Sequence, residues 1–165
     1  LYAWARRLGA TVIGTVSTEA KARLAREHGC EHVIVTPDYR FADAVQRLGG
    51  ADVIVDGLGD AARDQNLAGL ARRGHWISLG QASGPLQPVD ADALVAKSIS
   101  FSRPVVFDYV DTPQALAARA ARLWAALADG TLKAPPIERH ALAAAADAHA
   151  RLESRATSGA LVLIA

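Results

Sequence analysis

Short, nearly continuous apolar runs alternate with stretches in which apolar residues recur every three or four positions. The first pattern is typical of strands buried on both faces, and the second is typical of amphipathic helices. We expect strands at residues 11–16, 32–35, 51–56, 75–79 and 98–102. We expect helices at residues 1–8, 18–28, 41–48, 61–71 and 92–97. Strands that alternate with helices form parallel βαβ units, so the pattern predicts an α/β fold with a Rossmann-like, doubly wound parallel sheet.

Glycines and cations mark the ends of two of these helices. Gly29 is expected to supply the left-handed residue that ends the helix over 18–28. Arg72 and Arg73 are expected in the last turn of the helix over 61–71, because cations suit the negative end of a helix dipole. Gly74 is then expected to end that helix.

The last third of the chain has a different pattern. We expect an Ala-rich helix over 113–129, a short strand over 135–139, a second Ala-rich helix over 141–154 and a closing strand over 161–164. Alanine is the residue with the highest helix propensity, so the bias is read as a helix signal and not as low complexity.

Composition and charge exclude several classes of protein. The formal net charge is +1, and Trp, Tyr and Phe occur three times each, so no basic-aromatic surface for nucleic acid is expected. No apolar stretch is long enough to cross a membrane. The opening residues lack the pattern of a signal peptide, and none is expected. The single cysteine, Cys30, is read as a packing residue, and we expect a cytoplasmic protein. No Cys-x-x-Cys pair is present, and no metal is expected.

The carboxyl end of the first predicted strand carries a candidate phosphate site. Rossmann domains that prefer NAD usually end this strand with an acidic residue, whereas Ser17 stands here and Lys21 follows one helical turn later. A hydroxyl, backbone amides and an ammonium group together suit the 2′-phosphate of NADP. The alternative is that Ser17 caps the helix and that Lys21 is a solvated surface residue.

Two glycine-rich turns follow later strands. Residues 56–59 read Asp-Gly-Leu-Gly, and residues 78–84 read Ser-Leu-Gly-Gln-Ala-Ser-Gly. A turn without Cβ atoms lets the backbone approach a ligand, and exposed amides can bind a phosphate or a nicotinamide amide. Each segment could equally be an ordinary turn or loop.

The glycine-rich turn that places pyrophosphate on a helix N-terminus is absent. The chain opens inside a helix and without methionine, from which we expect a C-terminal fragment of a longer protein. We predict an apolar strand and a Gly-rich turn immediately upstream of Leu1.

Five motifs occur in a recognisable order. They lie at residues 16–21, 55–59, 77–84, 102–104 and 153–159, the last reading Glu-Ser-Arg-Ala-Thr-Ser-Gly before an apolar strand. Together they make the whole chain resemble the C-terminal half of the zeta-crystallin-like quinone oxidoreductases, within the medium-chain dehydrogenase/reductase superfamily.

This resemblance implies a homodimeric enzyme that reduces quinones with NADPH and without zinc. By matching, residues 1–138 would be a truncated NADPH-binding Rossmann domain, and residues 139–165 would belong to an otherwise absent GroES-like catalytic domain. The cofactor-binding residues that it implies are Ser17, Lys21, Gly57, Leu79, Gly80, Gln81, Ala82, Pro104, Val105, Val106 and Arg155.

Three further expectations qualify that assignment. Thr36 stands where the family often carries a tyrosine on the adenosine side, and Tyr39 lies slightly further on. Arg155 could instead pair with a neighbouring carboxylate such as Glu153. The dimer is expected to form through the sheet edge near Ser98–Ser102, because an edge strand presents unpaired backbone groups.

No catalytic residue is assigned, because a quinone can take its proton from water and no convincing acid–base pair is present. The substrate pocket would lie largely in the absent domain, so the fragment alone is expected to be inactive. Two other functions stay open. One is an enoyl-thioester reductase of the same superfamily, and the other is a non-enzymatic NADPH-binding or crystallin-like protein.

Overall fold

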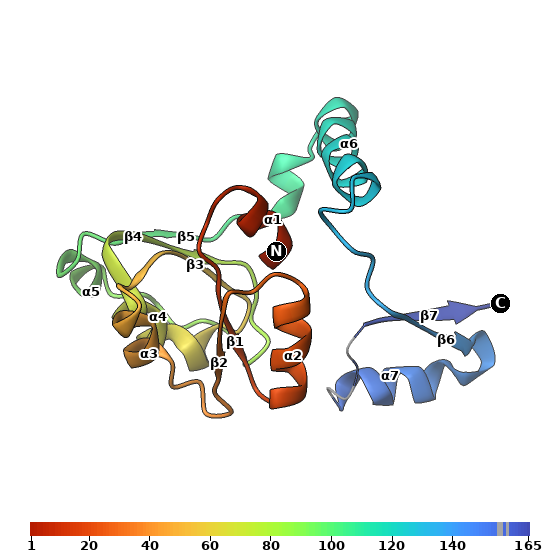
Figure 1. The fold of residues 1–165 in the computed structure, drawn as a ribbon, viewed down its shortest axis with the longest axis horizontal. Coiled ribbons are helices and arrows are strands. Elements are labelled where there is room, and N and C mark those ends of the chain that lie inside the picture. Colours follow the sequence, from red (N-terminus) through yellow and green to blue (C-terminus); the bar gives the residue numbers. More distant parts are fainter. Residues whose placement is uncertain (155–156, 158) are drawn as a thin grey trace. The chain divides into compact units, whose positions relative to one another are not determined.

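The computed structural model describes residues 1–154, 157 and 159–165. Its first ten regular elements alternate between helix and strand, as the sequence predicts (Figure 1). They are α1 (Tyr2–Arg7), β1 (Ile13–Val16), α2 (Glu19–Glu27), β2 (His32–Val35), α3 (Ala42–Arg47), β3 (Ala51–Asp56), α4 (Arg63–Gly69), β4 (Leu70–Ser78), α5 (Ala91–Val95) and β5 (Ser100–Ser102). A 3₁₀ turn, η1 (Asp60–Ala62), leads into α4.

Helix ends near the first two strands are set by local chemistry. Thr18 is the N-cap of α2, and its side chain accepts a hydrogen bond from the backbone N–H of Lys21. Gly29 follows the helix with a φ of +89°, which confirms the predicted left-handed residue.

All strand pairs among the described residues are parallel, which confirms the predicted class of sheet. β1 pairs with β2, and β3, β4 and β5 form a second ladder in that order. β1 and β3 therefore each keep one edge without a strand partner in the part of the chain that the structure describes. β5 is an edge strand, as expected for residues 98–102.

The predicted end of the helix over 61–71 is wrong. α4 ends at Gly69, and Arg72 and Arg73 lie in β4 within a register shift against β3. The Lys97 Nζ donates hydrogen bonds to the carbonyl oxygens of Leu67, Ala68 and Leu70, at 3.3, 2.7 and 2.7 Å. A cation does stabilise this helix end, but it arrives from a distant segment that no local pattern reveals.

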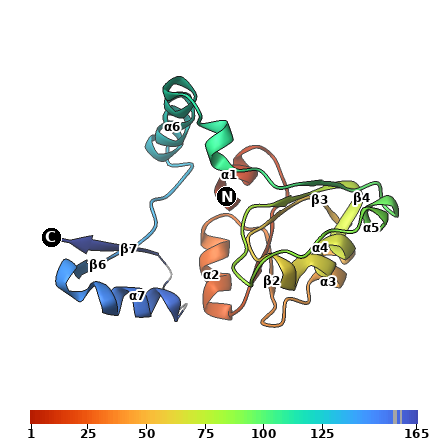
Figure 2. The same ribbon diagram turned by 180° about the vertical axis from the view of Figure 1, so that it is seen from behind.

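Three clusters of buried side chains hold these elements together. One gathers Val12, Ala25 and Cys30 beneath α2, and a second gathers Phe41, Val45 and Ala62 between α3 and the turn before α4. The third joins Leu70, Trp76 and Ile99 across β4 and the segment before β5. The Trp76 ring also meets Phe101 edge to face, with ring centroids 4.8 Å apart. α3 and α4 pack beside one another on β4, as both ribbon views show (Figures 1 and 2).

The chain divides into two compact units, Leu1–Trp124 and Ala125–Ala165. α6 (Pro113–Ala128) spans this division, whereas the sequence assigned residues 1–138 and 139–165 to separate domains. That assignment to a cofactor domain and a catalytic domain stays a prediction. In the second unit, β6 (Ile137–Ala141) pairs with β7 (Ala160–Ile164), and α7 (Ala145–Glu153) connects them. No helix among the described residues is long and apolar enough to span a membrane.

Candidate cofactor-binding site

Two turns at the carboxyl ends of β3 and β4 are bonded to one another, and we call them the interlocked turns (residues 57–59 and 79–84). The backbone N–H of Leu79 donates to the Asp56 carbonyl oxygen at 2.7 Å, and that of Ala82 donates to the Gly57 carbonyl oxygen at 3.2 Å. Ser83 donates to the Leu58 carbonyl oxygen twice, from its N–H at 2.8 Å and from its Oγ at 2.7 Å. The two predicted turns therefore form one structure.

The Asp56 side chain holds the turn over residues 57–59 in place. Its side chain is buried, and its carboxylate accepts hydrogen bonds from the backbone N–H groups of Leu58 at 2.7 Å and Gly59 at 3.3 Å. A carboxylate that accepts two backbone amides holds the turn in one conformation.

Two of the glycines are required because the turns lie so close together. A Cβ at Gly80 would lie 2.7 Å from the Gly57 carbonyl oxygen, and a Cβ at Gly59 would lie 2.8 Å from the Gly84 carbonyl oxygen. Gly59 also has a φ of +91°, which L side chains rarely adopt. Gly57 differs, because nothing lies within 4 Å of the position that its Cβ would take. The backbone at Gly57 is therefore open, and a ligand could approach it closely.

The carboxyl ends of β1 and β2 form a second group, which we call the strand-end corner (residues 17–21 and 36–40). The backbone N–H of Thr36 donates to the Val16 carbonyl oxygen at 2.8 Å, so Thr36 lies beside the residue that precedes Ser17. Because Thr18 caps α2, the Ser17 hydroxyl is left to accept from the Lys21 Nζ at 3.5 Å. The structure therefore brings the two predicted phosphate ligands together, through a long and exposed contact.

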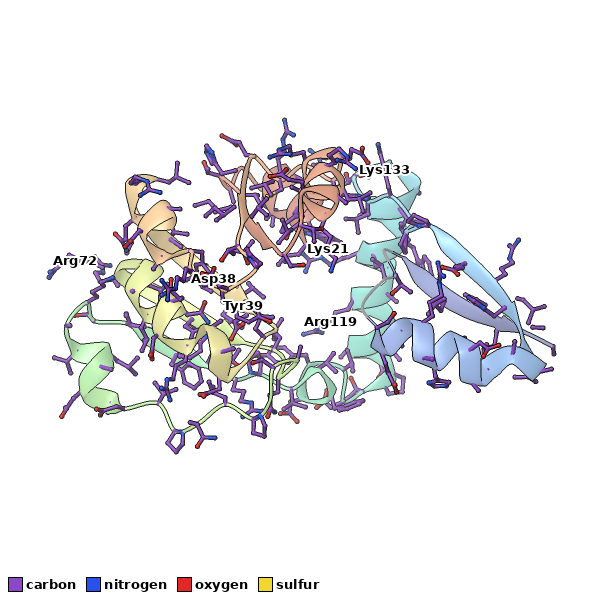
Figure 3. All side chains as sticks on the ribbon, turned by 90° about the horizontal axis from the view of Figure 1, so that it is seen from below. Lys21, Asp38, Tyr39, Arg72, Arg119 and Lys133 are labelled. Carbon is purple, nitrogen blue, oxygen red and sulfur yellow. The ribbon has the colours of Figure 1, made fainter. Side chains whose placement is uncertain are left out.

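A carboxylate that the sequence analysis missed also lies in the strand-end corner. Asp38 Oδ1 accepts from the Thr36 Oγ1 at 3.1 Å and from the Arg40 N–H at 3.3 Å, and its Oδ2 lies 3.5 Å from the Arg40 Nε. These donors, the Arg40 amide foremost, hold the pKa of Asp38 below its ordinary value. Tyr39, beside it, has a left-handed φ of 62° (Figure 3). Asp after Pro predicts a turn at residues 37–38, but this signal does not reveal that the Asp38 side chain bonds to its own loop.

The other predicted cofactor-binding residues differ in burial and in their contacts. Thr36 is buried and its hydroxyl already donates to Asp38. Leu79, Val105 and Val106 are exposed apolar side chains, at 60%, 51% and 63%. Arg155 lies outside the described residues. Within the ranges 1–154, 157 and 159–165, no three His, Cys, Asp or Glu side chains gather closely enough to hold a metal ion.

The amino-acid sequence matches a known protein family over most of its length. Residues 1–122 match the family described as zinc-binding dehydrogenase. The chain belongs to this family.

Individual relatives agree with the resemblance to quinone oxidoreductases. A quinone oxidoreductase of Pseudomonas aeruginosa is 38% identical over 98% of this chain and 51% of its own length. A 2-haloacrylate reductase from a Burkholderia species is 36% identical over 98% of this chain and 50% of its own length. The solved Escherichia coli quinone oxidoreductase, complexed with NADPH, matches with a TM-score of 0.91 and 32% identity, over 99% of this chain and 52% of that one. The chain thus spans about half the length of the relatives that it matches.

Proposed function

We propose that this chain is the NADPH-binding part of a reductase that transfers hydride to quinones without zinc. The observation that carries the proposal is the strand-end corner, where neutral Ser17 and the Lys21 ammonium meet at the end of β1. An acidic residue at Ser17 would repel a 2′-phosphate, whereas a hydroxyl and an ammonium attract it. The E. coli relative solved with NADPH supports the same cofactor.

Bound NADPH would supply the hydride, and the described residues would bind and orient it. Ser17 and Lys21 would hold the 2′-phosphate, with Thr36 behind them. Open Gly57 and the backbone of Leu79, Gly80, Gln81 and Ala82 would line the middle of the cofactor. The segment Pro104–Val106 would approach the nicotinamide end, and its exposed valines would keep water from that surface. Arg155 is retained as a proposed contact from the C-terminal segment.

The rest of the enzyme follows from the resemblance. The substrate pocket would lie mainly in a GroES-like domain to which residues 139–165 return, so these 165 residues alone would be inactive. The expected homodimer would form through the free edge of β5.

Cofactor binding is tested by Lys21→Ala in the full-length protein. We expect the dissociation constant for NADPH to rise about tenfold, equivalent to about 1.4 kcal/mol, while that for NADH stays unchanged. Fluorescence titration with both nucleotides measures this difference. Arg23→Ala is the matched control, because Arg23 is an exposed cation on the same helix. A wild-type protein that binds NADH as tightly as NADPH would contradict the proposal.

The substrate class needs a separate comparison. The 2-haloacrylate reductase relative favours a second candidate, the reduction of an activated carbon–carbon double bond such as that of an enoyl thioester. We expect the full-length protein to turn over benzoquinone with NADPH faster than a crotonyl thioester. The reverse order would favour the enoyl reductase, and NADPH binding with turnover of neither would favour a non-enzymatic role.

A further inference from the structure

The N-terminus of α3 is capped by a side chain from another helix. The N-cap residue, Phe41, offers no side-chain cap of its own. Instead, Gln65 on α4 places its Oε1 2.9 Å from the backbone nitrogens of both Phe41 and Ala42, which donate to it. One acceptor thereby satisfies two of the amides that the first turn of a helix leaves unpaired.

This cap fixes one end of the loop over residues 36–40. The other end is fixed where the Thr36 N–H donates to the Val16 carbonyl oxygen at 2.8 Å, beside Ser17. Between these two anchors Tyr39 is held at a φ of 62°, a conformation that costs free energy for a residue with a Cβ. The loop therefore depends on both anchors to keep its shape.

The loop also carries the carboxylate that could oppose a phosphate. Asp38 is turned back on its own loop by the Thr36 hydroxyl, the Arg40 amide and the Arg40 guanidinium. In this arrangement its carboxylate is paired with donors of its own loop. If the loop loosened, Asp38 would become an unpaired negative charge two residues beyond Thr36, whose N–H is bonded to the residue before Ser17.

We infer that Gln65 is a positioning residue for cofactor selectivity. By capping α3, it holds the loop over residues 36–40 so that Asp38 stays paired and the Ser17–Lys21 contact stays open to a 2′-phosphate. This inference rests on the proposed function, because it needs NADPH at the strand-end corner. It adds a residue on α4 that touches no proposed cofactor ligand.

The same pair of helices offers a matched control. At the other end of α3, the Gln46 Nε2 donates to the carbonyl oxygens of Ala68 at 2.7 Å and Leu70 at 3.0 Å. Gln46 thus ties α3 to the α4 end with two hydrogen bonds, as Gln65 does at the opposite end. Its bonds, however, lie away from the loop over residues 36–40.

The experiment compares the variants Gln65→Leu, Gln65→Glu and Gln46→Leu in the full-length protein. Dissociation constants for NADPH and NADH are measured by fluorescence titration, and thermal midpoints by calorimetry. We expect Gln65→Leu to weaken NADPH about fivefold to tenfold while NADH changes less than about twofold. Gln65→Glu should keep the wild-type ratio, because a carboxylate also accepts two amides at a helix N-terminus.

The control variant should lower the thermal midpoint to a similar extent and leave the NADPH-to-NADH ratio unchanged. If Gln65→Leu does not fold, Gln65→Asn, whose shorter side chain cannot reach both amides, takes its place. The inference about Gln65 would be overturned if the NADPH-to-NADH ratio stayed at the wild-type value in Gln65→Leu, or if it changed equally in Gln46→Leu. The proposed function would still stand. A wild-type protein without NADPH preference would overturn the proposed function, and this inference with it.

Discussion

The interlocked turns and the strand-end corner belong to the same Rossmann-like unit but are built in different ways. In the interlocked turns, backbone bonds as short as 2.8 Å join residues 57–59 to residues 79–84, and two glycines have no room for a Cβ. In the strand-end corner, the two proposed phosphate ligands meet only through a 3.5 Å contact at the surface.

The interlocked turns thus provide a fixed backbone shape, whereas the strand-end corner provides charge. The interlocked turns are fixed before any ligand arrives, because their geometry is part of the folded backbone. The strand-end corner contributes little to folding, since exposed polar contacts are weak in water. Its side chains gain importance only when an anion binds between them. Changes in the first region should therefore affect stability, and changes in the second should affect cofactor choice.

The largest effect is expected for Gly80→Ala. The new methyl group would collide with backbone atoms of Gly57, at 2.7 Å from its oxygen and 3.1 Å from its Cα, so the interlocked turns would have to separate. We expect the free energy of unfolding to fall by about 2–3 kcal/mol. Urea denaturation measures this change.

Gly57→Ala is the matched control for that variant, because the space around its missing Cβ is open. Its stability should stay within about 0.5 kcal/mol of wild type, while NADPH binding weakens where the methyl group blocks close approach. Equal stability losses in the two variants would show that the packing at Gly80 is not the deciding contact.

A smaller but more selective effect is expected for Ser17→Asp. The new carboxylate would face the proposed 2′-phosphate and pair with Lys21. We expect NADPH affinity to fall about thirtyfold, near 2 kcal/mol, with NADH affinity unchanged or improved. Titration of both nucleotides decides this, and Ser17→Ala serves as the control that removes the hydroxyl without adding charge. An unchanged preference for NADPH would mean that the phosphate binds elsewhere.

The smallest effect concerns Asp38. The Arg40 amide and the other donors lower its pKa in the folded state, so its ionised form stabilises the loop above the ordinary carboxyl pKa of about 3.9. That contribution is lost as pH falls through the lower folded value. We therefore expect wild type to lose stability between about pH 5 and pH 3 slightly more steeply than Asp38→Asn. Parallel urea midpoints for the two proteins over this range would contradict the prediction.

The sequence predicted those parts of the site that depend on neighbouring residues. Gly29 ends its helix in the left-handed region, and Ser17 and Lys21 meet because one helical turn separates them. The sequence did not reveal Gln65, which caps Phe41 and Ala42 from another helix. It also placed Arg72 and Arg73 in the last turn of α4, whereas they lie in β4. The cation that binds the carbonyl oxygens at the end of α4 is Lys97.

The alternation of apolar runs and amphipathic stretches determined by itself that the strands are parallel and that helices connect them, because a crossover connection leaves few other solutions. Tertiary structure decided which strand edges pair, how tightly residues 57–59 and 79–84 close on each other, and which distant side chain caps each helix. Local sequence patterns predict the conformation of residues that are close together along the chain. Contacts between residues more than twenty positions apart, such as those of Gln65 and Lys97, exist only after the elements have packed.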